Sequence, residues 1–177
     1  TNAPKNANGL YWIDCKVNGV NQDLYIERSR ILGTLLILNP GPNSRIDYGP
    51  INWSPVIPGY PALLVNGSFA IRATNHPLSE TENGVDYNFD GITGNYNNVA
   101  SEIHGLVGVS GVLTYKQNPQ IRGRVIVGGN GGVPVNNGSP TVTYVPDSLI
   151  NPPPPLGGFY TYRYQRRPAS AEKVVLH

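Results

Sequence analysis

The chain has 177 residues, of which 21 are glycine and 17 are proline, while only 14% are charged. So many helix-breaking residues exclude a long helical bundle, yet 39% hydrophobic residues suffice for the core of one domain. The single cysteine excludes an internal disulfide framework. A formal charge of +2 is too small for a dedicated polyanion binder, so we expect no nucleic-acid partner.

The first residues, 1–9, are polar and lack the basic-then-apolar pattern of a signal peptide. We therefore expect that any export or anchoring segment is missing from this sequence. No apolar stretch approaches the roughly 18 residues that a membrane helix needs, so we also expect no membrane span.

Short runs with a period of two, which are typical of strands, follow in chain order. In residues 13–17 the odd positions are apolar and the even ones charged, which predicts that Cys15 lies on an inward face as a structural thiol. Residues 31–38 are mostly apolar and end at the turn cluster 39–42, which predicts a strand with an abrupt stop.

Residues 74–100 are rich in asparagine and show no period, which predicts an irregular loop. Within it, the motif D-x-N-x-D-G resembles the start of a calcium loop with oxygen ligands at Asp86, Asn88, Asp90 and the Ile92 carbonyl. Asn97 replaces the bidentate glutamate at position 12, which excludes an EF-hand. The alternative is a turn whose side chains cap their own backbone.

Two segments, 102–111 and 120–129, share the pattern I-x-G-x-V-x-V-x-G, and every matched position is separated by the same offset. Partial copies occur in residues 31–37 and 63–69. A fixed repeat of about 18 residues with short strands is too short for a propeller blade but suits one coil of a parallel β-solenoid. This pattern predicts that Ile103 stacks on Ile121.

The predicted fold is therefore all-β, a right-handed parallel β-helix over residues 1–151, with the loop at about 74–100 inserted and an extended tail over 152–177. We expect Gly105 and Gly123 to lie where the chain bends or where another backbone comes close. The alternative is an antiparallel β-sandwich, whose strands also alternate and end in Gly/Pro turns.

Outward side chains also stack in this prediction, with His104 over Arg122 and Leu106 over Arg124. Glu102 then reaches Arg122 diagonally. A site that cleaves glycans needs a proton acceptor and a charge-stabilising cluster, and only one carboxylate stands nearby. No serine or cysteine nucleophile frame and no nucleotide-binding motif occurs, so we predict a non-enzyme with no catalytic residues.

The tail begins with four prolines at 152–155, which favour an extended spacer. Residues 159–167 then alternate, and this pattern predicts an aromatic strand. Three hypotheses follow: the strand covers its own coils, it docks on a neighbouring subunit, or it stacks on single-stranded nucleic acid. The candidate assembly residues are Phe159, Tyr160, Tyr162, Arg163 and Tyr164.

The run 102–129, with Pro119 before its second copy, resembles the right-handed β-helix segments of bactofilin-like and pilin-like exported bacterial proteins, as do residues 26–35. The resemblance covers about residues 10–145. It implies a structural, polymer-forming or surface-displayed protein, and it brings no catalytic residues.

These observations lead to the hypothesis of a self-assembling structural protein, a homo-oligomer or filament at the cell surface or outside the cell. Few thiols and few charges favour that location. The alternatives are a β-helix that binds or cleaves carbohydrate, with a surface glycan as partner, and an adhesion module that depends on structural Ca²⁺. No other cofactor is expected.

Overall fold

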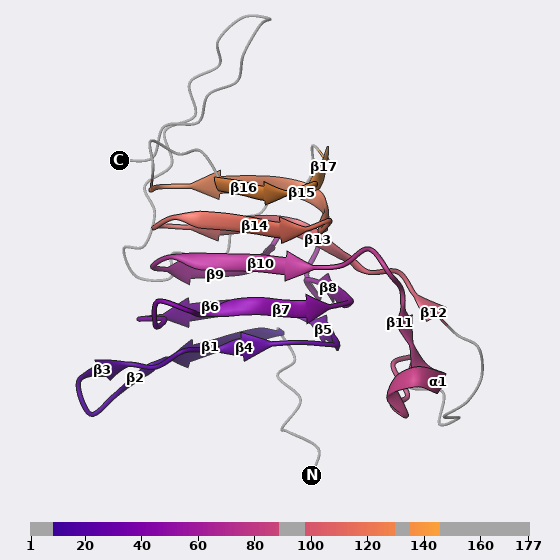
Figure 1. Ribbon diagram of the computed structural model, residues 1–177, viewed down its shortest axis with the longest axis horizontal. Helices are drawn as coiled ribbons and strands as arrows, with labels where there is room; N and C mark the ends of the chain where they lie inside the picture. The colour runs from indigo at the N-terminus through magenta and orange to yellow at the C-terminus, as the bar shows by residue number, and fades with distance from the viewer. Residues whose placement is uncertain (1–8, 89–97, 130–134, 146–177) are drawn as a thin grey trace, which may run out of the picture.

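The computed structural model describes residues 9–88, 98–129 and 135–145. These residues form strands and a single helical turn, so the protein is all-β. The largest sheet runs through six strands that all pair in parallel (Figure 1). In spatial order they are β1 (Leu10–Asp14), β6 (Thr34–Leu38), β9 (Pro61–Asn66), β13 (Glu102–Val109), β15 (Gln120–Val127) and β17 (Thr141–Tyr144).

Two further strands, β5 (Ser29–Leu32) and β8 (Ile51–Ser54), extend this sheet alongside the first part of β13. β13 therefore pairs with two different strands on the same side. Its beginning lies beside β8 and its end lies beside β9.

The second sheet is also entirely parallel. Its strands are β4 (Tyr25–Ile26), β7 (Arg45–Gly49), β10 (Phe69–Ala73), β14 (Leu113–Gln117) and β16 (Val135–Gly138). The chain alternates between the two sheets, and each pass adds the next strand to each of them. Successive passes therefore lie as layers one above the next, which we call the stack (Figure 1).

The predicted register between the two repeat copies is confirmed. Ile103 pairs with Ile121, and Gly105 pairs with Gly123, on neighbouring parallel strands. An antiparallel sandwich does not fit, because every pairing within the two large sheets is parallel.

The prediction of one fixed repeat length is wrong for the rest of the stack. Ile37 is the register partner of Val65, and Ile31 is the register partner of Trp53. Both separations along the chain are longer than that between Ile103 and Ile121, and they differ from each other. The strands keep their pairing while the connections change in length, because a connection at the surface can grow without disturbing the ladder.

Inward side chains from successive layers form one core between the sheets, and alternation along the strands selects them. Trp53 is the largest fully buried side chain, and its indole Nε1 donates a hydrogen bond to the Gly33 carbonyl oxygen at 2.9 Å. A second buried cluster lies on the other side of the largest sheet. This cluster explains why the run 35–38 is apolar without alternation, since side chains on both faces of the strand pack against a cluster. Its members are Leu36, Leu64, Leu106 and Ile126.

Glycine is required where layers meet at a bend, as the sequence predicted. Gly105 has φ of 103°, which favours glycine over any other residue. A Cβ atom on Gly123 would lie 1.9 Å from the Gly105 carbonyl oxygen, far inside contact distance. Gly33 stands at the same position two residues after Ile31, in the break between β5 and β6.

The prediction for residues 13–17 is confirmed in part. Cys15 is buried, but Ile13 is 38% exposed and Val17 is 53% exposed. Ile13 is exposed because β1 is the outermost strand. Val17 is exposed because the chain leaves the stack there in a hairpin of β2 (Lys16–Val17) and β3 (Val20–Asn21).

The segment 74–100 leaves the stack but is not entirely irregular. β11 (Leu78–Ser79) pairs with β12 (Asn98–Val99), and the helical turn α1 (Glu80–Asn83) follows β11. Ser79 caps this turn by accepting a hydrogen bond from the Glu82 amide, which is the usual use of serine at a helix start. The excursion lies to one side of the stack (Figure 1).

Candidate functional site: the two ends of the stack

The stack has two ends at which a strand pairs on one side only within the described residues. β1, β4 and β5 are the outermost strands of the first end, and β16 and β17 are those of the second. An outermost strand presents backbone donors and acceptors along its free edge, and that edge can pair with another chain.

The inward columns show how the ends differ from the middle. Ile13 and Ile37 are register partners, yet Ile13 is 38% exposed while Ile37 is completely buried. At the second end, Val142 continues the column of Ile103 and Ile121 and is 47% exposed, whereas Ile121 is 1% exposed. Both ends therefore present side chains of core type to solvent.

Aromatic side chains add to these surfaces. Trp12 is 69% exposed, and Tyr144 is more than half exposed. Such residues are enriched in protein interfaces because they bury a large area with few rotatable bonds. The exposed large hydrophobics at the ends are Tyr11, Trp12, Ile13, Tyr25, Leu32, Val135, Val142, Tyr144 and Val145.

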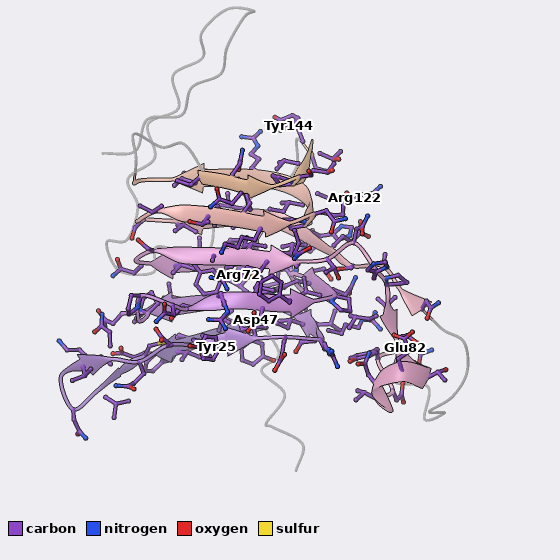
Figure 2. The ribbon with its side chains drawn as sticks, viewed as in Figure 1. Tyr25, Asp47, Arg72, Glu82, Arg122 and Tyr144 are labelled. Carbon is purple, nitrogen blue, oxygen red and sulfur yellow. The ribbon has the colours of Figure 1, made fainter. Side chains whose placement is uncertain are left out.

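The first end carries an ordered polar network on the second sheet. The Arg45 guanidinium lies 4.1 Å from the centroid of the Tyr25 ring and 2.8 Å from the Asp47 carboxylate. Hydrogen bonding from Arg45 holds the pKa of Asp47 below its usual value. Tyr25, Asp47 and Arg72 lie on the same face in successive layers (Figure 2).

Asp23 fixes the turn that precedes β7. Its Oδ1 accepts a hydrogen bond from the Asn43 amide at 2.9 Å, and its Oδ2 accepts one from Asn43 Nδ2 at 3.0 Å. These bonds, the side-chain one first, lower the pKa of Asp23. The ionised carboxylate of Asp23 therefore stabilises this turn at the first end.

The predicted outward ladder is confirmed. His104 pairs with Arg122 across the two strands, and Leu106 pairs with Arg124. Glu102 reaches Arg122 diagonally at 3.2 Å and also contacts His104 Nε2 at 2.7 Å. The pair of Glu102 and Arg122 joins β13 to β15, whereas Glu102 and His104 lie on one strand. Such partly exposed pairs contribute a few tenths of a kcal/mol to about 1 kcal/mol each.

Cys15 is 6% exposed, and burial, followed by the nearby charge of Asp14, raises the pKa of its thiol. The thiol therefore stays protonated and nucleophilic chemistry is disfavoured. Its backbone amide donates to the Leu38 carbonyl oxygen at 2.9 Å, which ties the end of β1 to the next layer.

The predicted calcium ligands are only partly visible. Asp86 and Asn88 are described, whereas Asp90 and Ile92 lie outside the described residues. The backbone amides of Tyr87 and Asn88 donate to the carboxylate Oε1 of Glu80, a residue that is 1% exposed. Within the described ranges no three His, Cys, Asp or Glu side chains group as metal ligands, so calcium binding stays a prediction.

The predicted assembly residues of the tail lie outside the described residues, the last of which is Val145. They are Phe159, Tyr160, Tyr162, Arg163 and Tyr164. The end residues of the stack were not among the residues predicted to make contacts. The alternation of Thr141–Tyr144 would have revealed one of them, because Val142 follows Ile121 at nearly the spacing of the repeat.

Comparison with known proteins found no matching family model, no matching curated protein and no matching solved structure. The bactofilin-like and pilin-like resemblance therefore rests on the sequence pattern alone. Among the described residues, no helix has the length and apolar character needed to cross a membrane.

Proposed function

We propose that this protein is a non-enzymatic structural protein that assembles with copies of itself, through the ends of its stack, into a filament or surface layer. In this proposal the stack is a right-handed parallel β-helix, and the tail 152–177 supplies a second contact. The protein acts at the cell surface or outside the cell.

The observation that carries the proposal is the exposure of core-type side chains at both ends. Val142 is 47% exposed where Ile121, its neighbour in the column, is 1% exposed. A second copy in the same orientation would bring its β5 beside β17 and would cover Val142 with Ile31, the first residue of that column. Burying such side chains contributes about 25 cal/mol per Å² of apolar area.

The direction of the strands determines the kind of assembly. All strands of the two large sheets are parallel, so the two ends are different surfaces. Contact between different surfaces is heterologous, and it generates an open filament unless rotation closes it into a ring. Composition supports the location, since few thiols and few charges suit a protein outside the cytosol.

Sedimentation velocity over a wide range of concentrations, with negative-stain imaging of the largest species, tests the proposal. We expect the wild-type protein to form species that grow with concentration. Val142→Lys should abolish this growth, because a charge would be buried at the contact without a partner.

Ser110→Lys is the control for the added charge, because Ser110 is exposed and directly follows β13, an inner strand with a neighbour on each side. It should assemble like the wild type. A wild-type protein that stays monomeric at every concentration, or equal loss of assembly in both variants, would contradict the proposal.

A further inference from the structure

A polar groove lies where the strands of the second sheet end, on the flank of the stack, and it reaches the second end at β16. It measures about 520 Å³, which is within the roughly 300–1,000 Å³ of small-ligand sites. Four layers contribute to it, from β7 to β16. The side chains that matter here are those of Tyr48, His76, Lys116, Asn118, Asn137 and Ser139.

The backbone gives this groove a defined wall. Gln117 has φ of 63°, a left-handed conformation that is uncommon for a residue with a side chain. A Cβ atom on Gly138 would lie 2.2 Å from the Gln117 carbonyl oxygen, so the two layers approach closely at this point. The Ser139 amide donates to that same oxygen at 2.7 Å.

The opposite side is formed by the chain that leaves β10. The Thr74 amide donates to the Gly49 carbonyl oxygen at 3.1 Å, and the Asn75 amide donates to Asn118 Oδ1 at 3.2 Å. These bonds position His76 beside the groove. Asn75 faces a different hollow, on the side of Glu102, so the segment forms a ridge between two hollows.

Lys116 gives the groove a positive charge. Among the residues that the structure describes, no carboxylate lines the groove and Lys116 makes no ion pair. The Arg72 guanidinium, which also interacts with the Asp47 carboxylate, lies 5.5 Å from the centroid of the Tyr48 ring and adds positive charge beside the groove. The nearby Asp47 is held by Arg45 at 2.8 Å.

We propose that this groove binds an acidic glycan, a polysaccharide segment whose sugars carry carboxylates. An exposed tyrosine offers an apolar face to a sugar ring, since Tyr48 is 47% exposed. The amides of Asn118 and Asn137 and the hydroxyl of Ser139 suit sugar hydroxyls, and Lys116 suits a carboxylate. The shallow, open shape fits a chain that passes through rather than a molecule that is enclosed.

Charge separates this ligand from a nucleic acid. Binding a polynucleotide requires a track of many cations along its phosphates, and the whole chain has a formal charge of only +2. A single exposed tyrosine also offers no series of stacking platforms. The proposal does not depend on assembly, because the groove lies within one copy of the chain.

Calorimetric titration with oligogalacturonate tests the proposal, at protein concentrations below those at which the wild type assembles. A neutral oligosaccharide of the same length and oligothymidylate serve as comparison ligands. Lys116→Gln and Tyr48→Ala are the test variants. Lys16→Gln is the matched control, since Lys16 lies in the exposed hairpin. Thermal unfolding checks that each variant is folded.

We expect oligogalacturonate to bind, and its Kd to rise about fivefold or more in Lys116→Gln while Lys16→Gln leaves it unchanged. Raising the salt concentration should weaken binding and shrink that difference. Absence of binding, equal binding of the neutral oligosaccharide, equal or tighter binding of oligothymidylate, or an equal effect of the two lysine variants would overturn the proposal.

Discussion

The middle layers and the end layers of the stack use the same kinds of side chain in different surroundings. Ile37 has a layer on each side and is completely buried, while Ile13, its partner in the outermost strand, is 38% exposed. The same contrast holds between Ile121 and Val142 at the other end. The stack thus ends without changing the chemistry of its inward columns.

The ends therefore differ from the middle in exposure but not in the type of their inward side chains. A protein that remains monomeric usually blunts the edges of its sheets with charges, prolines or bulges. Here the outermost strands carry Trp12 and Ile13 at one end and Val142 and Tyr144 at the other. These exposed apolar side chains are the physical basis of the proposed assembly.

Replacing Gly123 with alanine should have the largest effect on the middle of the stack. The new Cβ would meet the Gly105 carbonyl oxygen at 1.9 Å, so two layers must separate. We expect the free energy of unfolding to fall by more than about 4 kcal/mol, measured by denaturant titration. Gly19→Ala is the control, with a positive φ of 81° but no atom within 4 Å. It should reduce the free energy of unfolding by only about 1–2 kcal/mol.

Equal effects of these two glycine variants would mean that the layers do not touch at Gly123. The comparison between middle and end would then lose its structural basis.

The pair Ile37→Ala and Ile13→Ala tests the comparison within one column. Ile37→Ala should lower the free energy of unfolding by about 2–5 kcal/mol, because it leaves a cavity in the core. Ile13→Ala should lower it by less than about 1 kcal/mol, because solvent already reaches this side chain. Chemical unfolding of both variants at a concentration that keeps them monomeric is the measurement. Similar losses would show that Ile13 is covered in the monomer.

The smallest expected effect concerns Asp23, which orders the turn at the first end. Its pKa is lowered in the folded state, so its contribution is complete above the unfolded pKa of about 3.9 and is lost as the pH falls through the folded value. Asp23→Asn should therefore melt slightly below the wild type at neutral pH. The gap in Tm should begin to narrow below about pH 4 and should close as the pH falls through the folded pKa.

Melting curves of both proteins across this pH range are the measurement. A gap that persists at low pH would show that the carboxylate charge is not what orders the turn.

The register of the stack could be predicted from the sequence, because Ile103 and Ile121 and the glycines that follow them repeat at one offset. Trp53 could not be assigned to the same column, because connections of different length separate it from Ile31 and Ile103. Packing determines which residues of neighbouring strands pair, but it does not constrain the length of the surface connection between them.

The groove at Tyr48, His76 and Lys116 could not be predicted from the sequence either. Its residues come from separate layers and meet only because the strands end side by side. The diagonal pair of Glu102 and Arg122 was predictable, since it follows directly from the register of two adjacent copies of the repeat.

The contact between unlike ends is tested most directly by mixing two cysteine variants, each made with Cys15→Ala. One carries Val142→Cys at the second end and the other carries Ile31→Cys at the first, in the same column of the stack. Under mild oxidation we predict disulfide-linked dimers in the mixture and almost none in either variant alone. No cross-link in the mixture, or cross-linking of the Val142→Cys variant with itself to the same extent, would contradict the account.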